Sequence, residues 1–263
     1  MSAAPQIAGL MYHEVTDDPK TSGFQRAAAL PYTYGLAAFR RHLDAIAAAG
    51  VEPGVVTDID FTRGAGRHVL LTFDDGGASA LYAAEQLARR AWKAHFFIVT
   101  ARLGERTFLK PTDIRTLREM GHMVGTHSHT HPNIFRSLTS QLMLTEWRVS
   151  SAILESLLGE PCVAASVPGG DLSRTVLESV NEAGMRYLFT SEPQLRPERV
   201  GRTWILGRVA LKAGVSPATI RELVSFRGWQ RVQLLRRLGG LARSLSPSLY
   251  ARYVRLRTRE RPS

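Results

Sequence analysis

The sequence predicts an α/β protein built as a parallel (β/α) barrel. Short apolar runs alternate with longer segments of helical periodicity, which is the order that a parallel sheet requires. The chain has 263 residues, close to the roughly 250 of a typical barrel. Its 44% hydrophobic and 22% charged residues are ordinary for a globular protein. We therefore expect a barrel domain with a substantial hydrophobic core.

About seven runs have the length and apolar character of strands. They are residues 7–12, 69–73, 94–99, 123–126, 163–167, 187–190 and 203–211. Helical spacing of apolar residues predicts helices over residues 36–49, 78–91, 112–120, 138–158 and 172–183. Segment 16–34 fits neither pattern, and we expect either an ordered loop over the site or a lid.

Two polar motifs directly follow predicted strands. The first contains Asp74 and Asp75 before a glycine, and the second is the run His127-Ser128-His129-Thr130-His131. Alone, the first would favour a turn, and alternate histidines could share one face of a surface strand. The carboxyl ends of parallel strands lie at the same end of a barrel, where such folds carry their chemistry. One carboxylate and two imidazoles can bind a divalent metal with positions open for water, which leaves the second carboxylate as a base.

The two motifs resemble the first two motifs of the polysaccharide deacetylase family, the NodB-homology metal-dependent de-N-acetylases. Those motifs read T-F-D-D-G and H-[ST]-x-x-H, and both are present without a mismatch. The resemblance implies a distorted, incomplete (β/α) barrel. It also implies that Asp74 is the general base and that Asp75, His127 and His131 bind a divalent metal, with Zn²⁺ preferred. His129 occupies a variable position and is expected to be an exposed histidine outside the ligand set.

The implied reaction removes an N-acetyl group from an N-acetylated saccharide. A metal-bound water, with its pKa lowered to about 7, would attack the acetamide carbonyl while Asp74 takes its proton. The departing amine then needs a proton from a general acid. The expected products are acetate and a free amino sugar.

The later motifs of the family are altered in this chain. The third motif normally has an arginine beside a Pro-aromatic pair, but residues 166–171 contain neither that arginine nor the aromatic residue. Residues 189–193 replace the fourth motif, and no histidine follows His131 to supply the usual acid. Asp171 and Glu192 follow predicted strands, so we regard them as candidate substrate-binding residues.

His13 is the candidate for the missing acid. Strand 7–12 ends in Tyr12-His13, which resembles the start of a family branch that includes the poly-N-acetylglucosamine deacetylases, where an early histidine is the acid. We predict that His13 is the general acid; the alternative is a structural histidine at a strand end. Glu14 is expected to be a solvated neighbour.

Two other functions remain open. The altered motifs are compatible with a catalytically weakened or non-catalytic carbohydrate-binding relic of the family. The site residues also do not determine which molecule carries the acetyl group, so the substrate could be a non-sugar amide.

Positive charge is concentrated at the C-terminus. Residues 221–263 contain eleven arginines, no lysine and two acids, which accounts for +9 of the net charge of +11. We therefore divide the chain into a catalytic barrel (1–220) and an Arg-rich amphipathic tail (221–263), which Gly239-Gly240 and Pro247 should break into two or three short helices. Such helices bind anionic membrane surfaces or dock on the barrel. No nucleic-acid module is recognisable, and none is expected as a partner.

The expected location is cytoplasmic, with peripheral attachment at the inner membrane face as a further expectation. The N-terminus lacks the layout of a secretory signal. No window approaches the about 18 apolar residues of a membrane span. Cys162 is the only cysteine, so an intramolecular disulfide is excluded. A cytoplasmic enzyme would act on a glycan precursor, such as a lipid-linked one.

Overall fold

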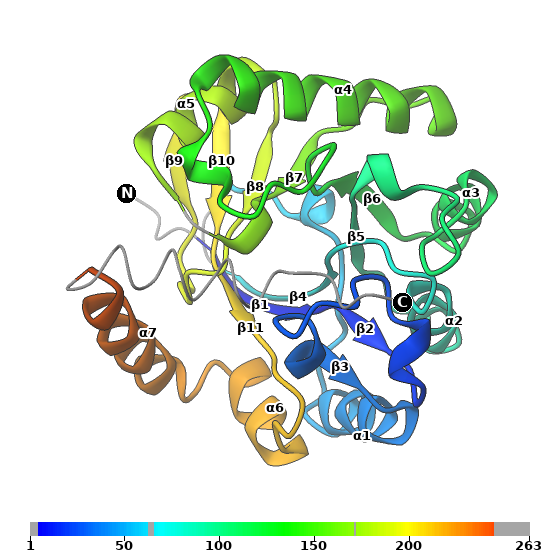
Figure 1. The fold of residues 1–263 in the computed structure, drawn as a ribbon. Helices are drawn as coiled ribbons and strands as arrows, with labels where there is room; N and C mark the ends of the chain where they lie inside the picture. Colours follow the sequence, from blue (N-terminus) through cyan, green and yellow to red (C-terminus); the bar gives the residue numbers. More distant parts are fainter. Residues whose placement is uncertain (1–4, 63–65, 171, 245–263) are drawn as a thin grey trace.

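The computed structural model describes residues 5–62, 66–170 and 172–244. Its main sheet has nine strands in the order β11-β1-β4-β5-β6-β7-β8-β10-β9. In chain order these strands are β1 (Gln6–Tyr12), β4 (Arg67–Phe73), β5 (His95–Ile98), β6 (Met123–Thr126), β7 (Ala164–Ser166), β8 (Tyr187–Phe189), β9 (Glu198–Val200), β10 (Thr203–Leu206) and β11 (Arg208–Ala210). Every pairing is parallel except that of β9 with β10. The predicted α/β class and parallel sheet are confirmed (Figure 1).

The two ends of the sheet are connected by one stretch of chain. β10 pairs with β8 and β11 pairs with β1, and only Gly207 separates β10 from β11. If this stretch is taken as one barrel strand, β1, β4, β5, β6, β7 and β8 complete the predicted set of about seven. The ladders at this junction are short, with three residue pairs each, so the barrel is distorted as expected.

The prediction of one continuous strand over residues 203–211 is therefore wrong, because the strand is interrupted at Gly207. A Cβ atom on Gly207 would lie 2.4 Å from the carbonyl oxygen of Glu192 and 2.5 Å from the amide nitrogen of Gln194. The backbone of the preceding loop thus passes too close for any side chain at this position. The strand breaks at Gly207 and changes its pairing partner there.

Helices surround the sheet (Figure 1). They are α1 (Leu36–Ala47), α2 (Ala80–Ala88), α3 (Pro111–Glu119), α4 (Ser140–Leu158), α5 (Arg174–Glu182), α6 (Pro217–Val224) and α7 (Trp229–Ser244). The first five match the predicted helices to within a few residues. Their ends follow local signals: Thr139 caps α4 by accepting a hydrogen bond from the amide of Leu142 (3.3 Å), and Gly159 ends it with a φ of 68°.

Alternation along β4 shows how the sheet separates its core from its site. Val69, Leu71 and Phe73 belong to the large hydrophobic cluster that includes buried residues of the helices. Leu70 lies in a different cluster, with residues from β1, β5 and β8. Side chains two residues apart share a face of a strand, so Thr72 and Asp74 continue the face of Leu70. The acidic motif therefore extends from the barrel's inner face.

Segment 16–34 is an ordered loop, the first of the two alternatives. It contains short 3-10 turns at Pro19–Thr21 and Leu30–Tyr32. Strand β3 (Thr33–Tyr34) ends it and pairs with β2 (Glu14–Val15). The loop is tied to the barrel by a hydrogen bond from the amide of Ala213 to the carbonyl of Pro31 (2.7 Å).

Glu14 is buried, with 2% of its surface exposed, so the prediction of a solvated side chain is wrong. Its carboxylate accepts hydrogen bonds from the amide of Gly23 (2.9 Å) and from Ser79 Oγ (2.5 Å). These partners lie 9 and 65 residues away in the chain, so no local sequence pattern showed them.

The proposed boundary between residues 220 and 221 passes through α6. Ile220, Leu223 and Val224 of this helix are all buried in the large core cluster, with residues of α1. Helix α7 continues through Gly239-Gly240, so the expected break there is wrong. Glycine costs a helix about 1 kcal/mol per residue but does not clash with it. Pro247 lies outside the described residues, and the division into barrel and tail otherwise stays a prediction.

Candidate active site

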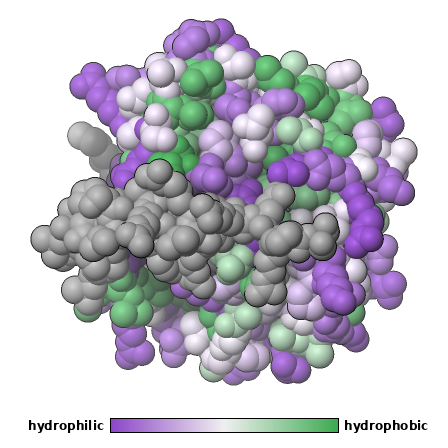
Figure 2. Space-filling view, in the orientation of Figure 1, coloured by the Kyte–Doolittle hydropathy of each residue, from purple (hydrophilic) through white to green (hydrophobic). Residues whose placement is uncertain are grey.

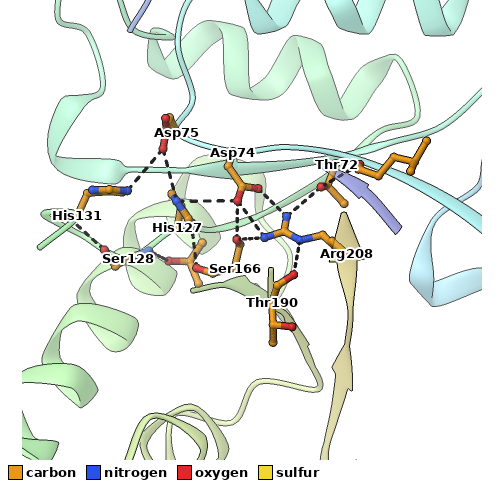
Figure 3. Close-up of polar contacts among 11 residues, drawn as sticks. Thr72, Asp74, Asp75, His127, Ser128, His131, Ser166, Thr190 and Arg208 are labelled. Carbon is orange, nitrogen blue, oxygen red and sulfur yellow. Dashed lines mark hydrogen bonds and ion pairs between the residues drawn. The ribbon is translucent and has the colours of Figure 1, made fainter. Parts of the chain in front are cut away.

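The sheet brings the two polar motifs together. The amide of Asp74 donates to the carbonyl of Tyr12 (3.1 Å), which extends the β1–β4 ladder to the acidic motif. The amide of His127 donates to the carbonyl of Ile98 (2.9 Å), which extends the β5–β6 ladder in the same way. Asp75 has a φ of 79°, a left-handed conformation that is uncommon for an aspartate. That conformation turns its side chain toward the histidines (Figure 3).

Asp75, His127 and His131 can hold a metal ion. Asp75 Oδ1 lies 3.4 Å from His127 Nε2 and 3.6 Å from His131 Nε2, and the three ligand atoms all lie within 4.8 Å of one another. Two donors about 2.1 Å from a tetrahedral ion are about 3.4 Å apart. The donor set and its spacing therefore fit a divalent cation such as zinc, but the metal's identity stays a prediction.

Hydrogen bonds orient the two histidines. His127 Nδ1 lies 2.9 Å from the carbonyl oxygen of Ser166 and donates to it, which leaves the lone pair of Nε2 facing Asp75. The amide of His131 donates to Ser128 Oγ (3.1 Å). His129 Nδ1 lies 2.9 Å from Thr100 Oγ1. The part-buried ring of His129 is thus directed away from the other two, and it is not part of the cluster.

Asp74 is bound by a residue that the sequence analysis missed. The Arg208 guanidinium donates to both carboxylate oxygens of Asp74, from Nη1 to Oδ1 at 2.7 Å and from Nη2 to Oδ2 at 3.0 Å (Figure 3). Arg208 also donates to Thr72 Oγ1 (2.9 Å), Ser166 Oγ (2.7 Å) and the carbonyl of Thr190 (3.0 Å). All five N–H donors of an arginine are thereby used. Such full pairing is what makes a guanidinium with 0% exposure tolerable.

The sequence does contain an indication that Arg208 is buried and paired. Arg208 lies between Leu206-Gly207 and Val209-Ala210, within a run predicted to be a buried strand. Arginine is almost never fully buried without a partner, so a lone arginine in such a strand indicates a buried acid nearby. Arg208 therefore provides a guanidinium bound to Asp74, although residues 166–171 contain no arginine.

Electrostatics keep the two carboxyl groups ionised. Burial alone would raise the pKa of Asp74, but the adjacent Arg208 outweighs it and lowers the pKa below its ordinary value. Burial would likewise raise the pKa of Asp75, but the hydrogen bond with His127 and the neighbouring imidazoles lower it. Both acids therefore carry negative charge at neutral pH.

The pKa values of the two histidines shift in opposite directions. Burial lowers the pKa of His131 to about 3, so its ring is neutral. Burial also acts to lower the pKa of His127, but the negative charges of Asp74 and Asp75 outweigh it and raise that pKa. A histidine must be neutral to bind a metal, so any proton on His127 would have to leave when a metal binds.

His13 lies where the prediction needs it, at the end of β1 and in the lining of the cavity beside Asp74 and Asp75. Its ring centroid is 4.8 Å from that of Tyr32. Its Nδ1 is buried and has no hydrogen-bond partner among the described residues. Burial lowers the pKa of His13, while the charges of Asp75 and Asp74 act in the opposite direction. The acid role itself stays a prediction.

Of the two candidate substrate-binding residues, the structure describes only Glu192. Asp171 lies outside the described residues. Glu192 forms an ion pair with Arg236 of α7, with Oε1 2.9 Å from Nη2. It is not among the described residues that line the cavity, so the structure places it beside the site.

A cavity of about 240 Å³ opens over the cluster. The loop 16–34 contributes Phe24, Arg26, Ala28, Ala29 and Tyr32 to its lining, so this loop covers the site as expected. Gly169, Gly170, Ser191 and Arg236 line it from other segments. The cavity therefore combines residues from the barrel, the loop and helix α7.

The fold and this site agree with the resemblance that the two motifs indicated. Residues 62–188 match the family model for polysaccharide deacetylase, which confirms the resemblance to that family. Among curated proteins, it is 28% identical over 116 residues to the peptidoglycan-N-acetylglucosamine deacetylase PgdA of Listeria monocytogenes. That match covers 43% of this chain and 24% of the relative, so the chain matches about a quarter of the relative's length.

Solved structures share the fold. The deacetylase PplD of Streptococcus pyogenes, determined in complex with acetate, superposes with a TM-score of 0.70 at 18% identity and covers 84% of this chain and 99% of its own. IcaB from Ammonifex degensii superposes with a TM-score of 0.67 at 21% identity, covering 88% and 98%. At these identities the similarity concerns the fold.

Proposed function

We propose that this protein is a metal-dependent hydrolase that removes an N-acetyl group from an N-acetylated saccharide or glycan precursor. The match to the polysaccharide deacetylase family model supports hydrolysis of an amide bond. The relative PgdA is named as a peptidoglycan-N-acetylglucosamine deacetylase, which supports a saccharide as the carrier. One observation supports the proposal most strongly: Asp75, His127 and His131 converge while Arg208 holds Asp74 beside them.

The three ligands would hold a divalent cation, for which we propose zinc, and that ion would supply Lewis acidity toward the acetamide carbonyl and acidify a water molecule. Asp74 is the base. Its lowered pKa keeps it ionised, and the fixed guanidinium and Ser166 Oγ orient both of its oxygens. As the water's oxygen bonds to the carbonyl carbon, Asp74 accepts the water's proton.

His13 is the acid in this proposal. The C–N bond breaks when the nitrogen receives a proton, and acetate and a free amine result. The carboxylates of Asp75 and Asp74 favour the imidazolium form of His13, and burial makes that form a stronger acid. Val167 and Ala210 line the cavity next to Ser166 and Arg208 along the chain, and they offer an apolar surface to the acetyl methyl group.

Arg208 bears on the alternative of a non-catalytic relic. That alternative depended on two losses, the arginine of the third motif and the late histidine. A relic has no need of a buried arginine that orients a base, and Arg208 provides one with all of its donors satisfied. Hydrolysis of a non-sugar amide would use the same residues, and a panel of acetylated amides distinguishes it.

The test is acetate release from N-acetylglucosamine oligomers with added zinc. Asp74→Asn should lower kcat at least 10³-fold, and His13→Ala by about 10²–10⁴-fold, the contribution of a general acid. His129→Ala is the matched control, because this histidine stands in the same motif but outside the cluster. Metal binding without turnover of any acetylated compound would support the relic instead.

We also propose that the protein attaches peripherally to an anionic membrane surface in the cytoplasm. No helix among the described residues is long and apolar enough to cross a bilayer. Leu234 and Leu235 of α7 are 59% and 69% exposed, close to the exposed Arg231. Elsewhere on the described part of the face in Figure 2, hydrophilic and hydrophobic residues are interspersed.

The positive charge of the Arg-rich C-terminal segment is the basis of the membrane proposal. Each arginine near an anionic leaflet contributes about 1 kcal/mol, and the cytoplasmic leaflet is the anionic one. The test is flotation of the protein with vesicles that contain phosphatidylserine. Leu234→Ser with Leu235→Ser should reduce flotation. The double variant Leu142→Ser with Val149→Ser on α4 is the control, because both of these side chains are also exposed. Equal flotation of both double variants would contradict attachment through α7.

A further inference from the structure

We infer that Glu146 of helix α4 is a positioning residue of the metal site, because its carboxylate holds the backbone between the two proposed histidine ligands, His127 and His131. The inference rests on the proposed function, since it assumes that these histidines bind a cation. It requires that Glu146 binds this backbone directly and that the backbone would otherwise relax. It also requires that the carboxylate acts through its hydrogen bonds and not through its charge alone.

One carboxylate oxygen of Glu146 binds two consecutive backbone amides of the histidine motif. Oε2 accepts hydrogen bonds from the amides of His129 (2.8 Å) and Thr130 (2.7 Å). Oε1 accepts a third hydrogen bond, from Thr130 Oγ1 (2.6 Å). Hydrogen bonds to an ionised carboxylate are about twice as strong as those between neutral groups. Helix α4 packs beside strand β6, which leads into the motif, so a 19-residue helix holds this carboxylate in place.

The other two amides of the motif bond to near neighbours in the chain. The amide of Ser128 donates to Thr126 Oγ1 (3.0 Å), and the amide of His131 donates to Ser128 Oγ (3.1 Å). These bonds shape the turn between the two histidine ligands. They do not link it to another element of the fold.

Two elements outside the motif bind its backbone. The amides of Thr100 and Ala101, in a 3-10 turn, donate to the carbonyls of Ser128 (3.4 Å) and His129 (2.9 Å). Helix α4 binds from its own side through Glu146. Because Glu146 accepts the motif's amides with its side chain, a substitution removes this contact and leaves the main-chain bonds of the 3-10 turn in place.

The backbone on either side of the two amides bound by Glu146 is strained. Ser128 has a φ of 65° and His131 a φ of 54°, left-handed values that are uncommon for residues with a Cβ atom. Such conformations persist only where the surrounding structure holds them. Without the carboxylate we expect the turn to relax. His131 Nε2 would then leave its place 3.6 Å from Asp75 Oδ1.

A carboxylate near a metal site could also act through its charge, and two substitutions separate the two roles. Glutamine retains the length of Glu146 and an oxygen that can accept both amides, and its NH₂ group can donate to Thr130 Oγ1. Aspartate retains the charge but is one methylene shorter, so it cannot reach the same donors. A positioning role predicts that Glu146→Gln resembles wild type and that Glu146→Asp does not. A role through charge predicts the reverse.

The experiment measures the zinc affinity of the full chain by competition with a chelator, in the absence of substrate. The Tm of the metal-free protein is recorded in parallel for Glu146→Ala, Glu146→Asp and Glu146→Gln. Glu155→Ala is the matched control. Glu155 lies on the same helix, and its Oε1 also accepts a backbone amide, that of Cys162 (3.1 Å), which does not belong to the histidine motif.

We expect Glu146→Ala and Glu146→Asp each to weaken zinc binding about tenfold, the lower end of the loss when a group that orients metal ligands is removed. Glu146→Gln should stay within about threefold of wild type, because it loses the charge and keeps the hydrogen bonds. Glu155→Ala should retain the wild-type affinity even where its Tm falls. The visible absorption of bound Co²⁺, which reports the geometry of the ligands, should change in the Ala and Asp variants and not in the other two.

Wild-type zinc affinity in all three Glu146 variants would overturn the inference. A loss in Glu146→Gln as large as that in Glu146→Asp would overturn it too, and this comparison decides the matter if Glu146→Ala does not fold. An equal loss in Glu155→Ala would also overturn it, because the effect would then be general to the helix.

Turnover tests the proposed function separately. A wild-type protein that binds zinc but releases acetate from no acetylated compound would refute the proposed hydrolysis, and the affinities of the Glu146 variants would still support or overturn the inference. A wild-type protein that binds no zinc would refute both.

Discussion

Arg208 and Asp74, 134 residues apart in the chain, form a bidentate ion pair at the centre of the site. The shortest distance, between Arg208 Nη1 and Asp74 Oδ1, is 2.7 Å. Neither side chain is exposed by more than 2%. The pair explains how a carboxyl group so deeply buried stays ionised, since the guanidinium outweighs the effect of burial on its pKa. It also fixes the orientation of both carboxylate oxygens of Asp74.

Replacing Arg208 by lysine should separate charge from geometry. Lysine retains the positive charge but has a single nitrogen, so it cannot bind both oxygens of Asp74 and satisfy Thr72, Ser166 and Thr190 as well. We expect the pKa of Asp74 to rise, which moves the acidic limb of the pH–kcat profile to higher pH. We also expect kcat to fall about 10²-fold.

The measurement is the pH–rate profile of Arg208→Lys against that of wild type, with thermal unfolding recorded in parallel. Breaking a buried pair costs about 3–5 kcal/mol, so the Tm should also fall. Arg199→Lys is the control, because Arg199 is an exposed strand arginine. An unchanged acidic limb in an active, folded Arg208→Lys protein would show that Arg208 does not control the ionisation of Asp74.

Metal content provides a test that does not depend on activity. We expect one divalent ion per chain after dialysis against zinc, and at least tenfold weaker binding in Asp75→Asn and in His131→Ala, because each removes one of the three donors. His129→Ala should bind as wild type does. Full zinc content in His131→Ala, measured by elemental analysis, would exclude His131 as a ligand.

Glu14 should make stability depend on pH. Burial raises the pKa of Glu14 from 4.5 to about 7 in the folded protein. Between pH 4.5 and pH 7 the folded state binds more protons than the unfolded state. The contribution of Glu14 to the free energy of unfolding is therefore complete below about pH 4.5 and is lost as the pH rises to 7. From the pKa difference, the loss is about 3 kcal/mol at most.

Glu14→Gln removes this titration and retains a polar amide for Gly23 and Ser79. The free energy of unfolding of the variant, measured in urea at pH 5, 6, 7 and 8, should therefore improve relative to wild type as the pH rises. Parallel curves for the two proteins would mean that Glu14 keeps an ordinary pKa when buried.

Gly207→Ala tests the closure of the barrel. The added Cβ would lie 2.4 Å from the Glu192 carbonyl oxygen and 2.5 Å from the Gln194 amide nitrogen, both backbone atoms that cannot rotate away. Overpacking of this kind costs about 1–3 kcal/mol, and it should also displace the adjacent Arg208. We expect a lower Tm together with a lower kcat.

Gly54→Ala is the matched control, since a Cβ at that position meets no atom within 4 Å. Gly54→Ala should leave both the Tm and kcat close to their wild-type values. A Gly207→Ala protein with wild-type Tm and kcat would show that the loop at 192–194 moves aside without cost.

The parts of this structure that sequence could predict are those encoded locally. The acidic motif at Asp74-Asp75 and the histidine motif at His127–131 each follow their strands directly, and the parallel sheet is enough to bring them together. Strand β6 (Met123–Thr126) was predicted to the residue for the same reason. Apolar periodicity and turn residues decide such elements over a few neighbouring positions.

The parts that sequence reasoning missed depend on distant segments. Arg208 is a binding partner of Asp74 only because β10 and β11 join both ends of the sheet, which no local pattern shows. Glu14 lies in a two-residue strand that pairs with Thr33–Tyr34 and is too short to give a periodic signal, and its buried carboxylate binds the distant Gly23 and Ser79. Gly239-Gly240 was read as a helix end, but α7 continues through it.

The junction at Gly207 links the order of assembly to the acquisition of activity. The stretch that carries Arg208 is the last of the barrel strands to leave the ribosome, and until it docks against β1 the carboxyl group of Asp74 has no cation to keep it charged. An incompletely synthesised or partly unfolded chain would thus possess the three proposed metal ligands but not the base of the proposed mechanism. The hydrolysis that we propose would begin only once the first and last strands of the barrel have met.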